Sequence, residues 1–156
     1  MLHIAIPGGE ELSLEHLVLD YNGTLAQDGH PLEGVRERLG ELAKVMTIHV
    51  ITADTHGTVE EKLRGYPVHV SIIGAGAQDE AKRRYVEALG VEGCAAMGNG
   101  RNDALMLGSA ALGVAVLQRE GMSMHLVGRA DIITTHILDA LDLLLIPSRL
   151  KATLRS

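Results

Sequence analysis

The chain has 156 residues, of which 46% are hydrophobic and 22% charged, and this composition is typical of a globular domain with a buried core. A net charge of −6 and the lack of Trp and Phe argue against nucleic-acid binding, which needs a basic face and usually stacking rings. The sequence has no apolar run of roughly 18 residues and no basic segment typical of a signal peptide. We therefore expect a cytoplasmic protein with neither a nucleic-acid nor a membrane partner.

The predicted elements alternate between apolar runs and amphipathic segments. In chain order, we predict strands over 2–7, 16–20, 46–53, 68–73, 94–100, 111–117 and 130–135, the fifth of which runs into a glycine loop. We predict a turn at 8–13, helices over 31–45, 57–65, 80–90, 101–110 and 136–147, and a helical turn within 122–129.

Strands that are separated by helices indicate parallel pairing through crossover connections. The predicted fold is therefore α/β: a three-layer, Rossmann-like parallel sheet with helices on both faces. We find no internal repeat, low-complexity tract or linker, so residues 1–156 are predicted to form a single domain. In such sheets the ligand crevice lies outside the carboxyl ends of the strands.

Polar side chains collect at these strand ends. Asp20 ends the second predicted strand, Thr52 and Asp54 end the third, and the loop Gly98–Asp103 follows the fifth. Lys82 lies near the start of the helix after the fourth strand. A carboxylate can attack phosphorus, a hydroxyl can hold a phosphoryl oxygen, a lysine can neutralise charge, and an acidic glycine loop can bind Mg²⁺.

Each of these residues also has an ordinary structural explanation. Asp20 could cap a helix or stabilise a turn, and Thr52 could satisfy a backbone group at a strand end. Lys82 could be a solvated helix residue, and an amide or acid of the loop 98–103 could cap the next helix. Only their order and their shared position at strand ends favour a common site.

Four segments of the chain together resemble the motifs of the haloacid dehalogenase superfamily of phosphatases and phosphotransferases. They are DYNGTLA (20–26), ITADTHGT (51–58), Lys82, and GNGRNDALML (98–107), and they occur in order over most of the chain. Their form is similar to the phosphorylation domain of P-type ATPases, although no transmembrane helix or nucleotide-binding domain is expected here.

The resemblance implies a role for each matching residue. Asp20 would be the nucleophile that forms an aspartyl phosphate, and Thr52 and Lys82 would bind the phosphoryl group. Asn22 would occupy the position of the general acid. The resemblance also implies phosphate binding by Gly23, Thr24 and Ala53. The implied Mg²⁺ ligands are Asp20, Asn22, Asn99 and Asp103. Of these, Asn22 would contribute its main-chain carbonyl, and Asp103 is the best acidic ligand of the fourth motif.

Two positions depart from the pattern of the superfamily. Its phosphatases usually carry Asp two residues after the nucleophile, where this chain has Asn22, and an amide cannot transfer a proton near neutral pH. Asn99 stands where an acidic metal ligand is usual, so Mg²⁺ affinity is expected to fall. We therefore predict slow turnover or a persistent aspartyl phosphate.

About 30 residues separate Asp20 from Thr52 and Thr52 from Lys82, which leaves room for one helical crossover but not for a cap domain. We expect an open site that accepts a small phosphorylated substrate or a phosphorylated macromolecule, in a homo-oligomer, most simply a dimer. His56, just beyond Thr52, is a further candidate for substrate contact. The leading hypothesis is a Mg²⁺-dependent phosphohydrolase, and the alternative is a regulatory or binding protein with attenuated catalysis.

Overall fold

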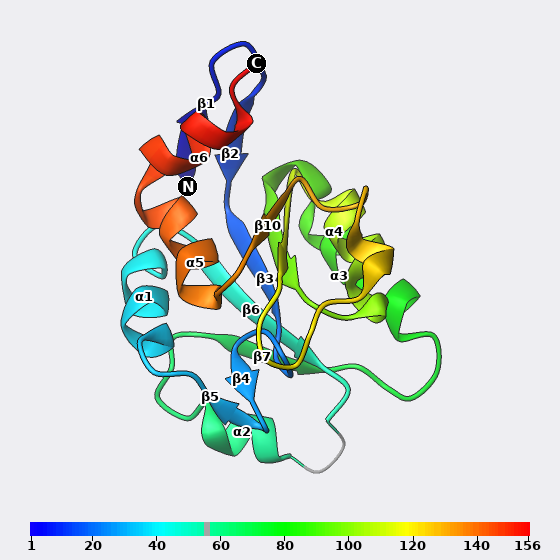
Figure 1. Ribbon diagram of the computed structural model, residues 1–156. Coiled ribbons are helices and arrows are strands. Elements are labelled where there is room, and N and C mark those ends of the chain that lie inside the picture. The colour runs from blue at the N-terminus through cyan, green and yellow to red at the C-terminus, as the bar shows by residue number, and fades with distance from the viewer. Residues whose placement is uncertain (55–56) are drawn as a thin grey trace.

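A six-stranded parallel sheet forms the centre of the computed structural model, which describes residues 1–54 and 57–156 (Figure 1). Its strands, in spatial order, are β10 (Ile132–Thr134), β9 (Leu112–Val116), β8 (Cys94–Gly98), β3 (His16–Asp20), β6 (Thr47–Thr52) and β7 (His69–Ile72). Of these six strands, β3 comes first in the chain and lies at the centre of the sheet. Later strands are added on one side of it as β6 and β7 and on the other side as β8, β9 and β10, so the order reverses between β3 and β8. This reversal is the topological switch point at which open α/β sheets bind their ligands.

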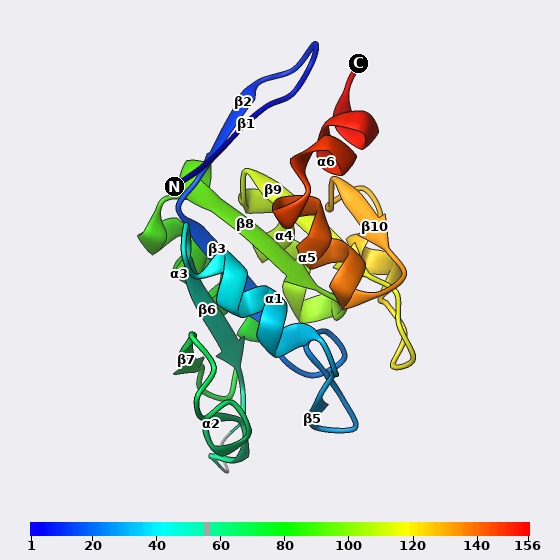
Figure 2. The same ribbon diagram turned by 90° about the vertical axis from the view of Figure 1, so that its left-hand side faces the viewer.

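Helices cover both faces of the sheet, which confirms the predicted α/β architecture. On one face, α1 (Val35–Leu42) packs against α5 (Ile137–Leu145), and on the other, α3 (Gln78–Leu89) packs against α4 (Ala104–Ser109) (Figures 1 and 2). A short helix, α2 (Thr58–Lys62), connects β6 to β7. Among the described residues, no helix combines the length and apolar character needed to cross a bilayer.

The apolar run of β3 is explained by burial on both sides. Leu17 and Leu19 pack into the core beneath α1 and α5, whereas Val18 points to the opposite core, with Val86 of α3 and Met106 of α4. Successive side chains of a strand alternate between faces, so a central strand covered on both faces is apolar throughout. Asp20 is the first charged residue after this buried run and is delivered to the carboxyl edge of the sheet.

The predicted turn at 8–13 is partly wrong, because residues 11–13 belong to the strand β2 (Glu11–Leu14). This strand pairs antiparallel with β1 (Leu2–Ala5) in a separate hairpin that extends beyond the central sheet (Figure 2). The hairpin buries Ile4 and Leu14 completely. The turn-forming glycines occupy only the tip, and the apolar residues on either side alternate with the period of a strand.

The predicted helix over 31–45 begins later, at Val35. Gly34 has a left-handed backbone, with φ of +86°, which separates the helix from the preceding segment. That segment forms a small hairpin of β4 (Ala26–Gln27) and β5 (His30–Pro31). In the described chain, this hairpin and α1 are the only elements between β3 and β6, so no cap domain is inserted there.

The predicted last helix, 136–147, corresponds to α5, and a further helix, α6 (Pro147–Leu154), follows it. Pro147 begins α6 rather than marking the end of helical structure, because the first turn of a helix does not need the missing N–H. Helix α6 packs along β1, and the N–H of Ser156 donates to the carbonyl oxygen of Pro7 at 3.2 Å. Short 3₁₀ helices lie at Val91–Gly93, Arg101–Asp103 and Met124–Leu126.

A histidine in the sheet is buried among other polar rings. His49 Nδ1 lies 2.9 Å from the hydroxyl of Tyr85, and its Nε2 lies 3.1 Å from Nδ1 of His16. Ser71 donates to the hydroxyl oxygen of Tyr85, which directs the Tyr85 proton toward His49 and favours a neutral imidazole. Burial, with contributions from His16 and His69, lowers the pKa of His49 to about 4.

We therefore expect the free energy of unfolding to decrease as the pH falls from about 6.5 toward 4. Over this range the unfolded chain binds a proton at position 49 that the folded protein excludes, and the shift corresponds to about 2–3 kcal/mol. Urea unfolding of the wild type and of His49→Gln at pH 7.5 and 4.5 measures this contribution. The decrease should be smaller in His49→Gln, and an equal decrease in both proteins would contradict the assignment to His49.

Candidate active site

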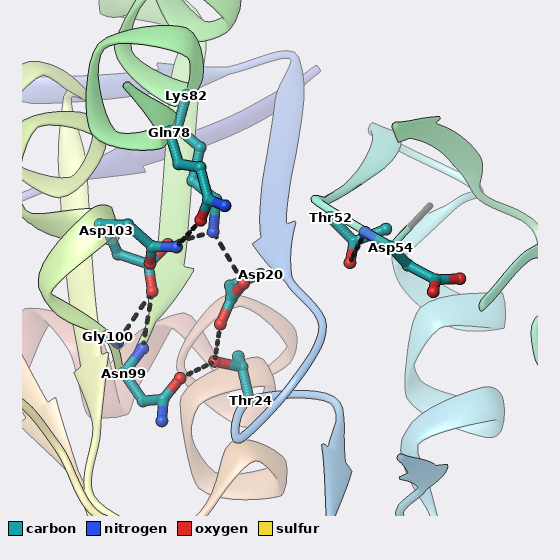
Figure 3. Close-up of polar contacts among 10 residues, drawn as sticks. Asp20, Thr24, Thr52, Asp54, Gln78, Lys82, Asn99, Gly100 and Asp103 are labelled. Atoms are coloured by element: carbon teal, nitrogen blue, oxygen red, sulfur yellow. Dashed lines mark hydrogen bonds and ion pairs between the residues drawn. The ribbon is translucent and has the colours of Figure 1, made fainter. Parts of the chain in front are cut away.

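Asp20, Lys82 and Asp103 form a charged triad at the carboxyl edge of the sheet (Figure 3). Lys82 Nζ donates to Asp20 Oδ1 and to Asp103 Oδ1, and both distances are 2.7 Å. The exposed fractions are 8% for Asp20, 1% for Lys82 and 0% for Asp103. The lysine is thus a buried cation between two carboxylates, which rules out the solvated helix residue considered from the sequence.

The three residues meet because β3 and β8 end, and α3 begins, at the same edge of the sheet. Asp20 closes β3, Lys82 lies on the second turn of α3, and Asp103 belongs to the turn after β8. The second carboxylate oxygen of Asp103 accepts the backbone N–H groups of Asn99 (3.1 Å) and Gly100 (2.9 Å). A side chain at Gly98 would overlap the carboxyl group of Asp103, so the end of β8 needs a glycine.

The charges of the triad depend on one another. Burial by itself lowers the pKa of Lys82, but the charges of Asp20 and Asp103 outweigh this effect, and the pKa is raised. Lys82 therefore keeps its proton. Burial and then the charge of Asp20 raise the pKa of Asp103 to about 7, against the opposing effect of Lys82. The site thus depends on the lysine for its electrostatic balance.

The turn after Asp20 connects the end of β3 with the loop after β8. Thr24 Oγ1 lies 3.2 Å from Asp20 Oδ2 and 3.3 Å from Asn99 Oδ1, and the side-chain nitrogen of Asn99 donates to the Gly121 carbonyl at 3.1 Å. Gly23 has φ of +76°, and a side chain there would overlap the Asn99 amide. One oxygen of Asp20 and one of Asn99 therefore converge on the same hydroxyl.

The second motif faces Asp20 from the end of β6, and Figure 3 shows Thr52 and Asp54 on the other side of Asp20 from Asp103. The hydroxyl oxygen of Thr52 accepts the N–H of Asp54 at 3.3 Å. Asp54 Oδ2 in turn accepts the N–H of Val59 (3.0 Å) and the hydroxyl of Thr58 (3.1 Å) in the first turn of α2. His56 lies outside the described residues.

A cavity of about 420 Å³ opens between these elements. Asp20, Asn22, Thr52, Ala53, Lys82 and Asn99, all predicted from the sequence, line it. Gly23 borders a neighbouring cavity of about 410 Å³, and Thr24 and Asp103 lie fully buried behind the site. The structure therefore brings the predicted residues together, while the chemical role of each stays a prediction.

Other residues of the cavity were not predicted. The side-chain nitrogen of Asn102 donates to Oε1 of Gln78 at 2.8 Å, and Tyr21 and Lys62 both donate to the Gly29 carbonyl. Gln78 lies four residues before Lys82 on α3, so helical spacing could have identified it. No sequence pattern marks Lys62 or Gly29, because they meet only through the fold.

The cavity offers oxygen ligands suited to a hard cation, but few of them are acidic. Among the described residues, no group of three or more His, Cys, Asp or Glu side chains is placed to hold a metal ion. The carboxylate of Asp20 and the amides of Asn22 and Asn99 supply oxygen atoms at the cavity surface. This donor set matches the preference of Mg²⁺, which takes oxygen ligands and retains several waters.

Sequence comparison identifies relatives but no described activity. No family model matches the chain. An uncharacterized protein of Methanocaldococcus jannaschii is 43% identical over 84 residues, which cover 51% of this chain and 90% of that protein. A second uncharacterized protein of the same organism is 49% identical over 39 residues, which cover 25% of this chain and 89% of that protein.

Solved structures with the same fold include phosphatases. A protein of Streptomyces avermitilis assigned to the HAD family hydrolases has a TM-score of 0.69 at 22% identity, with coverage of 92% of this chain and 97% of that one. The 3-deoxy-D-manno-octulosonate 8-phosphate phosphatase of Moraxella catarrhalis was solved in complex with magnesium, phosphate and KDO. Its TM-score is 0.63 at 21% identity, with coverage of 85% of this chain and 86% of that one. The cobalt-bound deoxy-D-mannose-octulosonate 8-phosphate phosphatase of Haemophilus influenzae has a TM-score of 0.68 at 13% identity, with coverage of 93% of this chain and 92% of that one.

These comparisons agree with the topology of the central sheet. The fold of the haloacid dehalogenase superfamily, expected from the four motifs, is confirmed over most of the chain. The chain therefore has the haloacid dehalogenase fold and belongs to the same protein family as the 43% identical protein of Methanocaldococcus jannaschii.

Proposed function

We propose that the protein is a phosphohydrolase that cleaves phosphomonoesters through an aspartyl phosphate on Asp20. The observation that carries this proposal is the Asp20 carboxylate itself, which sits at the switch point of the sheet, opens into the cavity, and is paired with a buried lysine. Solved phosphatases with this fold support the same reaction class.

The proposed reaction has two displacements at phosphorus. An oxygen of Asp20 forms a bond to phosphorus while the bond to the leaving oxygen breaks, and that oxygen departs with the electron pair. Water then attacks the phosphorus, the bond to the Asp20 oxygen breaks, and inorganic phosphate leaves. Lys82 offsets charge on the phosphoryl oxygens, and Thr52 lies where its hydroxyl can bind one of them.

Proton transfer is the weak step in this arrangement. The leaving oxygen needs a proton and the attacking water must lose one, but the Asn22 amide can do neither near neutral pH. Asn22 lies exposed at the cavity surface, so solvent must carry these protons. Turnover is therefore proposed to be slow.

Mg²⁺ would be held by Asp20, the main-chain carbonyl of Asn22 and the side-chain oxygen of Asn99, and when bound it would neutralise phosphoryl oxygens. The convergence of Asp20 Oδ2 and Asn99 Oδ1 on Thr24 supports this set. Asp103 fits less well as a direct ligand, because it is fully buried and does not line the cavity. We propose that Asp103 acts by holding Lys82.

The alternative is a binding or regulatory protein that no longer turns over. The buried triad favours the enzyme, because desolvating a lysine and two carboxylates costs several kcal/mol that an apolar core would avoid. A protein that had lost catalysis would gain stability by replacing the triad. Detecting no turnover with any phosphomonoester would support this alternative.

The test is a screen of phosphomonoesters, beginning with p-nitrophenyl phosphate, with Mg²⁺ and with excess EDTA. We expect activity that requires Mg²⁺ and is abolished in Asp20→Asn. Acid-quenched mass spectrometry should find a phosphoryl group on Asp20 in the wild type only. Full activity in EDTA or in Asp20→Asn would overturn the proposed function.

A further inference from the structure

A second lysine, Lys62, faces the same cavity as Asp20 and differs from Lys82 in its partners. It is the last residue of α2 and is half-buried at the edge of the cavity. Its ammonium donates to the carbonyl oxygen of Gly29 at 2.7 Å, and the hydroxyl of Tyr21 donates to that same oxygen at 2.8 Å. Lys62 is therefore held in a defined position above the turn between β4 and β5.

The charge of Lys62 is not neutralised by an ion pair within the described chain, whereas Lys82 contacts two carboxylates. The Gly29 carbonyl takes one N–H of the ammonium, and a lysine has three to donate. Asp54 also lines the cavity, but its Oδ2 accepts two hydrogen bonds from the start of α2, where the helix dipole offsets negative charge. The cavity is thus lined by one lysine that is paired with Asp20 and Asp103 and by a second lysine that contacts a carbonyl oxygen.

We propose that Lys62 determines substrate specificity by binding a second negative charge on the leaving group, which rests on the proposed function of Asp20. The cavity volume corresponds to a sphere roughly 9 Å across, a size suited to a small organic phosphate. Asp20 and Lys62 both line this cavity, so the leaving group must be small enough to fit in it beside the phosphoryl group. The preferred substrate is a small phosphomonoester that also carries a carboxylate or a second phosphate.

The remaining lining agrees with a small polar acid. Gln78 and Asn102 provide amides on the side of the cavity formed by α3, and Asn22 provides another at its mouth. Among the described residues, Tyr21 is the only aromatic residue of the lining, and at 1% exposure it presents no free face for a base to stack on. These features favour an acid with hydroxyl groups over a nucleotide.

The substrate pair for the test is 3-phosphoglycerate and glycerol 3-phosphate, which differ by a carboxylate in place of a hydroxymethyl group. The wild type should have a higher kcat/KM for 3-phosphoglycerate, and Lys62→Met should lower this preference about tenfold, mainly through KM. Lys62→Arg should retain most of it. Lys44→Met is the matched control, since Lys44 is exposed and paired with Glu41, and it should keep the wild-type preference.

A readout that does not need turnover is calorimetric binding of both esters to Asp20→Asn, with and without Lys62→Met. Tighter binding of 3-phosphoglycerate that disappears with Lys62 supports the inference even if hydrolysis is too slow to measure. Equal binding of the two esters to Asp20→Asn overturns it. If Lys62→Met lowers the binding affinity equally for both esters, the inference is also overturned, because Lys62 would then only connect α2 to the β4–β5 turn. The proposed function fails separately, if Asp20→Asn retains wild-type turnover of p-nitrophenyl phosphate.

Discussion

Lys82→Met is expected to destabilise the protein by about 3–5 kcal/mol and to abolish turnover. The substitution keeps an unbranched side chain one atom shorter but leaves the carboxylates of Asp20 and Asp103 buried without a cation. Removing one partner from a buried ion pair costs this much because the remaining charge stays desolvated. Urea unfolding at pH 7.5 gives the loss in the free energy of unfolding, and a phosphatase assay gives the loss in turnover.

The control for this variant is Lys44→Met, which removes the same charge from an exposed position. Exposed ion pairs contribute roughly 0–1 kcal/mol, so Lys44→Met should unfold at nearly the wild-type urea concentration. A second comparison is the double variant that combines Lys82→Met with Asp103→Asn, in which the negative charge of one of the two buried carboxylates is removed as well. Stability should partly recover in this double variant. If Lys82→Met is as stable as the wild type, then Lys82 does not balance the two carboxylates.

Asn22→Asp is expected to raise turnover by at least about tenfold, below the roughly 10²–10⁴-fold ceiling for general acid–base catalysis. The new carboxylate would lie at the cavity surface, where it could give a proton to the leaving oxygen and accept one from the attacking water. Asn22 makes no side-chain hydrogen bond within the described residues, so the change should break no contact. Two nearby carboxylates would repel each other, which is expected to limit the gain.

Two esters whose leaving groups differ in their need for a proton provide a sharper test of this prediction. Glycerol 3-phosphate releases an alkoxide that needs a proton, whereas p-nitrophenolate departs readily without one. The gain in Asn22→Asp should therefore be larger for glycerol 3-phosphate. Asn22→Ala should show no gain, and Asp20→Asn should remove turnover in either background. If Asn22→Asp folds normally but is no faster with either ester, then Asn22 positions the substrate and is not a missing acid.

The arrangement of the site was largely predictable because parallel strands share an edge. The apolar runs that end at Asp20 and Thr52 identified two of the strand ends, and the glycine loop after residue 97 identified a third. Crossover connections then placed these ends together without any knowledge of distances. The sequence could not show that Lys82 is buried, since a helical lysine is more often solvated.

Features formed by contacts between distant residues were the ones that were missed. The strand over 2–7 was predicted, but its partner β2 was missed, and so was α6, which packs along β1 from more than a hundred residues away. Lys62 meets Gly29 only because α2 folds back beside the β4–β5 turn. Asp103 was predicted as a metal ligand, because the spacing of a loop does not show which partners its carboxylate oxygens contact.

The central position of β3 affects how the chain can fold as it is synthesised. One edge of β3 pairs with β6, where His16 is opposite Thr47, and the other pairs with β8, where His16 is opposite Cys94. The first pairing is available once residue 52 has left the ribosome, but the second must wait for residue 98. During this interval a central strand of the sheet has an open hydrogen-bonding edge, which is a template for association with other chains. Translation through α2, β7 and α3 is therefore the period in which a nascent chain most needs a chaperone.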